Sequence, residues 1–300
     1  MTCNFPVAEV DLRSFPVFTT EVNMNRREML SVAGGGVATV LSSGGRGRSP
    51  APPASEGIRL GVASYSLRNF QRHMAISTLK QLGVQWVSVK DAHLSYADAD
   101  DDTKGKAEFE KAGMTIVSGG VIYLNEKDPK GLRYYFEYAR RCGMPMITAG
   151  PTHSDLDEVE KLAREFNIRV AIHNHGPEDK EFPTPQSVLS VVKSRDSRMG
   201  LCIDLGHTLR TGANVVETIT EAGPRLLDLH IKDLRSATDK ASQCDVGQGV
   251  MPVVAIFKQL KKMGYAGTIN LEYEINAENP LPGMANSLSY MRGVLAGLAG

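Results

Sequence analysis

The sequence predicts one closed (β/α)8 barrel, and three observations support this fold class. Short β-rich apolar runs alternate with helical patterns along the 300-residue chain, and eight such units can be counted. The units repeat at about 30 residues, so their strands are expected to be parallel and joined by right-handed crossovers. The segment that carries them, residues 58–300, is close to the about 250 residues of a typical barrel of this kind.

The eight predicted strands are short, apolar and rich in β-branched residues. A doubly wound open sheet is the alternative, but it calls for a GxGxxG motif after the first strand, and "VASYSLRNF" has no glycine. The strands are "IRLGVAS" (58–64), "VQWVSVK" (84–90), "MTIVSGG" (114–120), "PMITAG" (145–150), "IRVAIHN" (168–174), "MGLCIDL" (199–205), "LLDLHIK" (226–232) and "GTINLEY" (267–273).

Helical patterns fill the segments between the strands and follow the last one. Apolar residues recur at helical spacing, and several patterns end in glycine, the usual C-terminal stop, at Gly83, Gly113, Gly143 and Gly264. The helices are predicted over residues 71–82, 104–112, 130–141, 154–166, 185–193, 213–222, 252–263 and 282–297.

The N-terminal part of the chain differs in composition from the rest. Arg26 and Arg27 precede Met29 and Leu30, a Gly-rich apolar run and a Ser/Pro/Gly linker, which is the three-part pattern of a twin-arginine export signal. We expect residues 24–57 to be this signal with its linker, residues 1–23 to be an N-terminal extension of unassigned role, and the mature protein to be periplasmic. A tail that happens to contain Arg-Arg is the alternative. The apolar run is shorter than the about 20 residues that span a bilayer, so no stable membrane association is expected after cleavage.

Composition limits the classes of partner. Lys and Arg together number 34 and Asp and Glu number 34, so the net charge is zero and no overall field favours nucleic acid. The four cysteines are far apart in sequence, which predicts free thiols rather than a disulfide framework or a zinc ribbon. A homo-oligomer is left open by these data.

Ionisable residues gather at the ends of the last four predicted strands. His173 and His175 end the fifth strand, where alternate side chains point the same way about 6.6 Å apart. The other three strands contribute Asp204 and His207, then His230, Lys232 and Asp233, and finally Glu272 and Glu274. The carboxyl ends of the strands are where barrels of this type place their active sites.

Asp204, His230 and Glu272 occupy equivalent heights on adjacent strands, so their tips are expected to converge. Two buried carboxylates side by side repel each other and lose hydration, which costs several kcal/mol unless a cation or tight hydrogen bonding compensates. A divalent metal ion is therefore predicted at the C-terminal end of the barrel.

The motifs "GLCIDLGHT", "LDLHIKDL", "VGQGVMPV" and "INLEYE" occur in this order at those strand ends. Together they resemble the xylose isomerase-like TIM barrel superfamily, the sugar phosphate isomerase/epimerase group, over roughly residues 58–298. The resemblance implies a single divalent ion held by His173, Asp204, His230 and Glu272.

His173 departs from the pattern of that group, in which glutamate is usual at this position. A neutral imidazole leaves two carboxylates to balance the ion, and nitrogen ligands favour Mn, Fe, Co or Zn over Mg. The substitution also removes one of the paired glutamates of family epimerases. A histidine-rich fifth strand resembles the inosose dehydratase branch, which performs elimination beside a ketone.

The predicted reaction is proton removal next to a carbonyl of a sugar or cyclitol through a metal-stabilised enediolate, giving isomerisation, epimerisation or elimination. His175, His207, Lys232 and Glu272 are the predicted catalytic residues. The predicted substrate contacts are Tyr65, Arg68, Lys90 and His93. Gly247 and Gly249 mark a tight loop that either approaches the substrate or simply turns.

Two rival functions remain at this point. One is phosphodiester cleavage of the endonuclease IV type, which the motif "GLCIDLGH" also resembles. That type has three zinc ions and a D-x-H after the seventh strand, whereas this chain reads "ASQCDVGQG" there. The other rival is a noncatalytic sugar-binding barrel that keeps the metal site.

Overall fold

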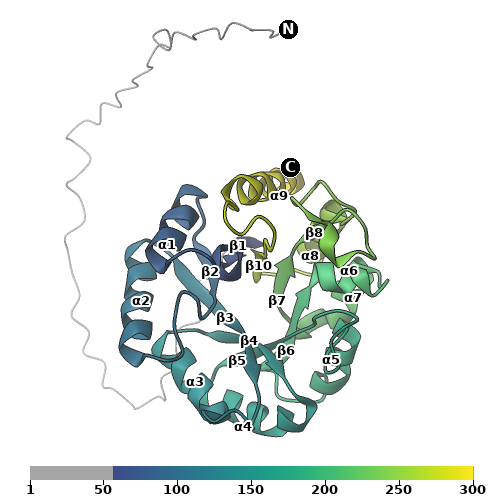
Figure 1. Ribbon diagram of the computed structural model, residues 1–300. Coiled ribbons are helices and arrows are strands. Elements are labelled where there is room, and N and C mark those ends of the chain that lie inside the picture. Colours follow the sequence, from purple (N-terminus) through teal and green to yellow (C-terminus); the bar gives the residue numbers. More distant parts are fainter. Residues whose placement is uncertain (1–56, 300) are drawn as a thin grey trace, which may run out of the picture. The chain divides into compact units, whose positions relative to one another are not determined.

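The computed structural model describes residues 57–299. Eight parallel strands close into a barrel in the order β1-β10-β7-β6-β5-β4-β3-β2, with helices around the outside (Figure 1). The predicted fold class is therefore confirmed. The barrel strands are β1 (Arg59–Ala63), β2 (Trp86–Val89), β3 (Thr115–Leu124), β4 (Met146–Pro151), β5 (Arg169–His173), β6 (Met199–Asp204), β7 (Leu226–Ile231) and β10 (Thr268–Leu271).

Nine α-helices are assigned within the described residues. Gly83, Gly113, Gly143 and Gly264 follow four of them with positive φ, so the glycine stops expected from the sequence are present. The helices are α1 (Arg72–Gln81), α2 (Ala99–Lys111), α3 (Gly131–Arg141), α4 (Leu156–Phe166), α5 (Pro185–Val192), α6 (Leu205–Arg210), α7 (Val215–Ala222), α8 (Val253–Lys262) and α9 (Leu281–Ala299).

Four features differ from the sequence expectation. Helix α2 begins at Ala99 rather than residue 104, because the Asp98 carboxylate caps it by accepting from the backbone N–H groups of Asp100 and Asp101. Strand β3 continues to Leu124, and its register against β4 shifts between Gly119 and Ile122. A two-residue hairpin, β8 (Asp233–Leu234) with β9 (Gln243–Cys244), and the short helix α6 were not predicted.

Side chains divide between two buried regions, as the pleat of the strands requires. The larger core lies where the helices pack on the barrel, and it includes Phe109, Phe136 and Phe257, each fully buried. A smaller cluster of Met146, Ala171 and Cys202 is separate from it. Residues two apart on a strand point to the same face. Ala171 therefore shares the inner face of the barrel with His173, and Cys202 shares it with Asp204.

A polar layer lies within the barrel below those C-terminal ends. The fully buried Asp228 carboxylate accepts from Asn270 Nδ2 at 2.9 Å, and from the hydroxyls of Thr148 at 3.3 Å and Ser118 at 3.4 Å. Burial raises the pKa of Asp228 to about 6. At this level the interior of the barrel is therefore filled by hydrogen-bonded side chains.

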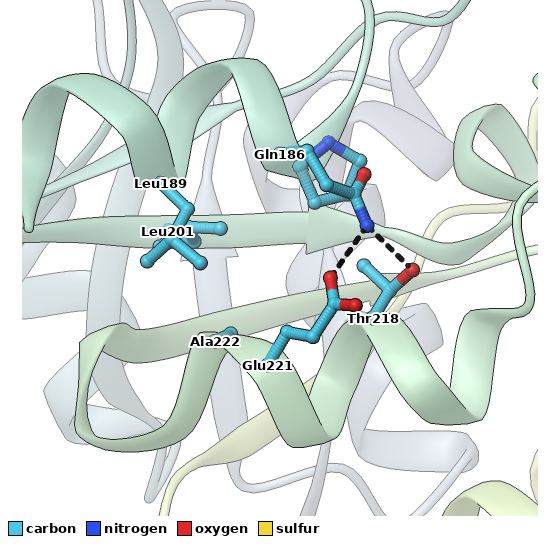
Figure 2. Close-up of a pocket in the computed structure, with 7 residues that line it drawn as sticks. Gln186, Leu189, Leu201, Thr218, Glu221 and Ala222 are labelled. Atoms are coloured by element: carbon cyan, nitrogen blue, oxygen red, sulfur yellow. Dashed lines mark hydrogen bonds between the residues drawn. The ribbon is translucent and has the colours of Figure 1, made fainter.

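The outer helices are tied to one another by polar contacts as well as by apolar packing. Figure 2 shows a small pocket between α5 and α7, where the Gln186 amide donates to Thr218 Oγ1 at 3.2 Å and to Glu221 Oε2 at 2.9 Å. Leu189 and Leu201 line the same pocket. This arrangement joins two helices and lies apart from the strand ends.

Two further expectations concern the cysteines and the N-terminal part of the chain. Cys142, Cys202 and Cys244 are free and buried, as predicted, while Cys3 lies outside the described residues. The predicted signal and linker also lie outside them, apart from Gly57. In residues 57–299 no helix combines the length and the apolar character needed to cross a bilayer.

Candidate metal centre and active site

Four side chains from four neighbouring strands meet at the C-terminal end of the barrel. His173 ends β5, Asp204 ends β6, His230 lies near the end of β7 and Glu272 follows β10. One nitrogen or oxygen atom from each of these residues lies within 4.8 Å of all the others. The register explains the meeting, because Asp204 pairs with His230 and the backbone N–H of Glu272 donates to Ile231 O at 3.0 Å.

These four side chains are buried, and several of their polar atoms have no partner. Within the described residues, both ring nitrogens of His173 and His230 make no hydrogen bond, and Oδ2 of Asp204 has only ion-pair neighbours. An unsatisfied buried polar group costs about 1–3 kcal/mol, so four imidazole nitrogens in one place call for an explanation. Two imidazoles and two carboxylates are a donor set suited to Mn, Fe, Co or Zn. The residues present therefore fit a divalent ion.

A second candidate group of metal ligands overlaps the first. His173 and His230 also lie with the Cys202 thiol inside the barrel. Burial raises the pKa of Cys202 to about 12, and a thiol must lose its proton to bind metal. Both groups found in the described residues share the same two imidazoles, so they define one candidate metal centre. An enzyme of the endonuclease IV type would need ligands for three zinc ions.

Asp204 uses its two carboxylate oxygens for different purposes. Oδ1 accepts from the backbone N–H of His207 at 2.7 Å and so caps the short helix α6. Oδ2 is left facing the centre. Asn174 fixes the backbone at this point, since its Oδ1 accepts from Asp204 N at 3.0 Å and its Nδ2 donates to Thr208 Oγ1 at 3.2 Å.

Lys232 places a buried ammonium group beside the candidate ligands. Its Nζ lies 3.1 Å from Asp204 Oδ2, 2.9 Å from Glu272 Oε2 and 2.6 Å from Glu274 Oε2, with the side chain 4% exposed. The lysine stem runs against Gly206, where an added Cβ would overlap Lys232 Cγ. The glycine in the "DLGH" motif is thus explained by packing against the lysine.

The contacts of Lys232 control the ionisation of the carboxylates. Burial raises the pKa of Asp204 and of Glu272, but the Lys232 ammonium and the neighbouring histidines together outweigh it and leave both pKa values below their usual range. Burial lowers the pKa of Lys232, and the neighbouring carboxylates more than reverse this. Burial raises the pKa of the third carboxyl, Glu274, although Lys232 opposes the change. When all three carboxyls are ionised, two negative charges remain against the one ammonium, which is the charge that a divalent ion neutralises.

The histidines of the centre respond to burial in two ways. Burial lowers the pKa of His173 to about 4, so its imidazole is neutral and able to bind a metal. Burial also lowers the pKa of His230, but contact with Cys202 and Glu272 raises it overall.

Backbone contacts fix the segment that carries Glu272 and Glu274. Gln243, on the short strand β9, donates from Nε2 to Glu272 O and accepts at Oε1 from Glu274 N, both at 3.0 Å. On the other side, the Ser66 hydroxyl accepts from Tyr273 N at 2.8 Å. Two side chains distant in sequence therefore hold the two glutamates in place.

Asp233 shapes the loop that contains the glycines of "VGQGV". Its Oδ2 accepts from the N–H groups of Gly247 and Gly249, and its Oδ1 accepts from Met251 N, all at 2.9–3.0 Å. A Cβ on Gly249 would overlap the Asp233 carboxylate and the backbone of Leu234. Of the two interpretations of these glycines, the structure supports the turn.

His175 and His207 lie beside the centre, each with a charged neighbour. Their ring centroids are 5.9 Å apart, and that of His175 is 4.5 Å from that of His173. His175 Nδ1 lies 3.0 Å from Asp179 Oδ2, and His207 Nδ1 lies 3.2 Å from Arg210 Nη1. Burial lowers the pKa of both imidazoles, that of His207 to about 4. Both predicted catalytic histidines are thus next to the four candidate ligands.

The predicted substrate contacts from the first two strands have different surroundings. Arg68 lies over the ring of Tyr65 at 4.8 Å and donates to the backbone oxygen of Glu274 at 2.7 Å. Lys90 Nζ donates to Val121 O at 2.6 Å and lies 3.5 Å from Asp91 Oδ1. Arg68 therefore supports the segment after β10, while the Tyr65 and Lys90 side chains remain partly exposed.

His93 has the environment of a structural residue. Its ring is 1% exposed, Nδ1 lies 2.9 Å from Ser64 Oγ, and Nε2 lies 3.2 Å from the backbone oxygens of both Leu67 and Phe70. Both nitrogens are thus occupied by protein atoms. The geometry favours a packing role for His93 over the substrate contact predicted from the sequence.

Sequence reasoning missed several residues around the site. Asp179, Arg210 and Gln243 lie in loops or in very short elements, where no hydrophobic period marks them. Tyr123 was hidden because β3 was predicted to stop at residue 120; its ring is 63% exposed and its hydroxyl lies 3.4 Å from His175 Nε2. The acidic pair in "HGPED" was the one signal that pointed to a partner for His175.

The closed barrel carries its four candidate metal ligands at the carboxyl ends of its strands, where (β/α)8 enzymes place their active sites. A model of the xylose isomerase-like TIM barrel family matches residues 76–294 of this chain. The chain belongs to that family, as its motifs led us to expect.

Two curated proteins match parts of the chain. Uncharacterized protein MJ1311 of Methanocaldococcus jannaschii is 29% identical over 124 residues, which are 40% of this chain and 41% of that protein. The rhizopine catabolism protein MocC of Rhizobium meliloti is 26% identical over 151 residues, or 45% of this chain and 44% of MocC. The matches thus span less than half the length of either relative.

Solved structures match nearly the whole barrel. A D-tagatose 3-epimerase-like protein has a TM-score of 0.65 at 16% identity, covering 79% of this chain and 97% of its own. The IOLI protein with a bound zinc atom has a TM-score of 0.65 at 17% identity, covering 79% and 98%. The probable 3-DHS dehydratase AsbF of Bacillus anthracis has a TM-score of 0.64 at 13% identity, covering 78% and 98%. At these identities the similarity shows the fold alone.

Proposed function

We propose that this protein is a divalent-metal-dependent enzyme that removes a proton beside a carbonyl group of a sugar or cyclitol. The product is an isomer, an epimer or an elimination product of that substrate. The observation that carries the proposal is the convergence of four buried donor atoms within 4.8 Å, with unpartnered imidazole nitrogens among them. The presence of an epimerase-like protein, a probable dehydratase and a zinc-containing protein among structures of the same fold supports it.

His173, Asp204, His230 and Glu272 would hold the ion. When bound, the ion would act as a Lewis acid that stabilises negative charge developing on the substrate carbonyl oxygen. The four candidate ligands are buried, none of them more than 6% exposed, so bulk water has little access to their donor atoms. Lys232 keeps the two carboxylates ionised and adds a positive charge next to them.

Proton transfer falls to groups of the chain that flank this centre. The ring centroids of His175 and His207 lie 4.5 Å and 6.1 Å from that of His173. Burial lowers the pKa of both imidazoles, so each ring is neutral at neutral pH and has a nitrogen that can accept a proton. Tyr123, exposed beside His175, offers a hydroxyl and an aromatic face to a substrate. Tyr65 and Lys90 remain proposed substrate contacts.

Exchange of substrate hydrogen with solvent tests the proposal directly. Keto-sugars and 3-oxo-glycosides would be incubated with the protein in D2O, and deuterium incorporation beside the carbonyl would be followed by NMR. Chelation should abolish the exchange, and Mn or Zn should restore it. Metal content of the purified protein should be close to one ion per chain.

Matched variants separate the metal centre from general damage. Asp204→Asn should lose both the ion and the exchange, whereas Asp157→Asn, whose side chain is 91% exposed, should keep both. Exchange that survives Asp204→Asn at the wild-type rate would refute the proposal. Sugar binding with metal bound but no exchange on any substrate would instead indicate the noncatalytic barrel.

We further propose export by the twin-arginine route, on the strength of the Arg26–Arg27 pattern. Fusion of residues 1–57 to a reporter that is active only after export tests this. Replacement of both arginines by lysine should abolish the signal of the reporter. A signal that persists in the double variant would refute the route.

A further inference from the structure

The two imidazoles next to the metal centre have neighbours of opposite hydrogen-bonding character. A carboxylate can only accept a hydrogen bond, and a guanidinium can only donate one. His175 faces the Asp179 carboxylate with Nδ1, at 3.0 Å, and His207 faces the Arg210 guanidinium with Nδ1, at 3.2 Å. Each contact therefore specifies which nitrogen of the neutral ring carries the hydrogen.

We propose that Asp179 and Arg210 are positioning residues that hold the two imidazoles in opposite tautomers, His175 with an accepting Nε2 and His207 with a donating Nε2. The Asp179 contact places the hydrogen of His175 on Nδ1 and frees the lone pair of Nε2. The Arg210 contact uses the lone pair of His207 Nδ1, so the hydrogen of His207 lies on Nε2. One ring thus accepts from the substrate and the other donates to it.

Asp179 has no freedom to reverse its contact with His175. Its other oxygen, Oδ1, accepts from the backbone N–H groups of Glu181 at 2.8 Å and Phe182 at 3.2 Å. The backbone N–H of His175 donates to Phe182 O at 3.1 Å, and this contact holds the same loop against the end of β5. The carboxylate is therefore fixed by the main chain, with Oδ2 directed at the imidazole.

Arg210 is equally constrained. Its side chain is 6% exposed, and Nη2 forms an ion pair with Glu178. A Cβ on Gly176 would come within 3.1 Å of Arg210 Nη1 and 3.4 Å of His207 Nδ1, so the absence of a side chain at Gly176 gives the guanidinium its place beside the ring. His207 Nε2 has no hydrogen bond within residues 57–299, which leaves it available to a ligand.

The two roles differ in what they contribute to the proposed reaction, and this assignment of roles rests on the proposed function. His175 Nε2, which lies 3.4 Å from the Tyr123 hydroxyl, is placed to accept a proton from the substrate or from that hydroxyl. His207 is placed to donate a hydrogen bond to a substrate oxygen. The two fixed tautomers thus assign proton acceptance to one ring and hydrogen-bond donation to the other, which two imidazoles free to change tautomer would not do.

Long-range 1H–15N NMR of the protein labelled with 15N-histidine tests the inference without turnover. The spectra would be recorded with the protein chelated and with zinc added, because zinc is diamagnetic. His175 should show the Nδ1–H pattern and His207 the Nε2–H pattern, each assigned by the loss of signals in His175→Gln and His207→Gln. The same tautomer for both rings in the wild-type protein would overturn the proposal, whatever the variants do.

Substitution of the positioning residues sharpens the test. In Asp179→Asn the amide oxygen is required by the two backbone N–H groups, so the NH2 group faces His175 and should switch it to the Nε2–H tautomer. Exchange activity should fall by about 10–100-fold. Arg210→Met should release His207 to a mixture of tautomers, and Arg210→Lys, which still donates, should restore the wild-type pattern.

A control and the pattern of outcomes separate this inference from the proposed function. Arg133→Met removes an exposed ion pair with Glu165 and should leave both tautomers unchanged. Opposite tautomers without exchange on any substrate would refute the function and leave the positioning roles standing. Exchange with an unchanged His175 spectrum in Asp179→Asn would refute the positioning role of Asp179 and leave the function standing.

Discussion

Asp204 Oδ1 accepts a hydrogen bond from the backbone N–H of His207 at 2.7 Å, while Oδ2 of the same carboxylate faces His173 and Lys232. One side chain thus joins the capping of a helix to the construction of a candidate metal centre. Helix α6 and the centre are expected to respond together when this residue is changed.

Substitutions of Asp204 should separate its two roles. Asn is as good a helix cap as Asp but is a poor ligand for a divalent ion, whereas Ala is neither. Both variants should lose metal affinity by more than the about 10–100-fold typical of residues outside the ligand set. In chelator, Asp204→Ala should be less stable than Asp204→Asn by about 1 kcal/mol, measured by denaturant unfolding. Equal stability of the two would contradict the capping role.

Lys232→Met should make the protein dependent on metal for stability. Without the ammonium, Asp204 and Glu272 are left buried and uncompensated, and the loss of one partner from such a cluster costs about 3–5 kcal/mol. An ion at the centre replaces the missing charge, so the rise in melting temperature on adding Mn or Zn should be larger for the variant than for the wild type. A smaller rise would show that Lys232 helps to hold the ion rather than competing with it.

Gly206→Ala tests the packing of the lysine stem against α6. The added methyl group would overlap Lys232 Cγ and displace the ammonium from the carboxylates. We expect lower stability, by about 1–3 kcal/mol, together with weaker metal binding. Gly293→Ala in α9 is the matched control, because a Cβ there has no neighbour within 4 Å, and it should be neutral or slightly stabilising. Similar behaviour of the two variants would argue against the contact.

The contact between Arg72 and Asp101 predicts a stability change in acid. Hydrogen bonds from the Arg72 guanidinium lower the pKa of Asp101 below its usual value. A carboxyl of this kind stabilises the fold above its unfolded pKa of about 4 and loses that contribution as the pH falls through its lower folded pKa. The Asp101 side chain is 35% exposed, so solvent screening limits the coupling to about 1 kcal/mol or less.

A double-mutant cycle with Arg72→Met and Asp101→Asn measures this coupling. The free energies of unfolding of the four proteins would be compared at neutral pH and at pH values below about 4. The coupling energy should be present at neutral pH and should vanish in acid. A coupling that grows as the pH falls would contradict the direction of the pKa change.

The barrel was predictable because each strand carries its own signal. Runs such as residues 199–203 are apolar on both faces, as strands buried between helices and a barrel interior require, and the glycine stops fix the helix ends. Helix α6 was missed because six residues are too few to show a hydrophobic period. It forms because Asp204 caps it and because Lys232 packs against Gly206, and both contacts are tertiary.

The candidate site divides in the same way. His173, Asp204, His230 and Glu272 could be placed together from their positions at strand ends, and the structure brings them within 4.8 Å, although their binding of an ion stays a prediction. The acidic pair after His175 was a signal for one partner, but its contact with the ring and the contact of Arg210 with His207 could not be derived, since the loop that brings Asp179 and Gly176 back to the strand ends depends on backbone contacts with Phe182 and Pro183. Loops of this kind have no sequence period.

All four candidate ligands come from the second half of the barrel, β5 to β10, whereas Tyr65, Lys90 and Tyr123 come from the first half. The residues proposed to hold the ion and those proposed to contact the rest of the substrate are therefore encoded by separate, contiguous stretches of the gene. Under the proposed function, recombination that exchanges the first stretch between relatives is expected to alter substrate preference and to keep the reaction chemistry. Such modularity makes the first four strands the place to diversify in directed evolution.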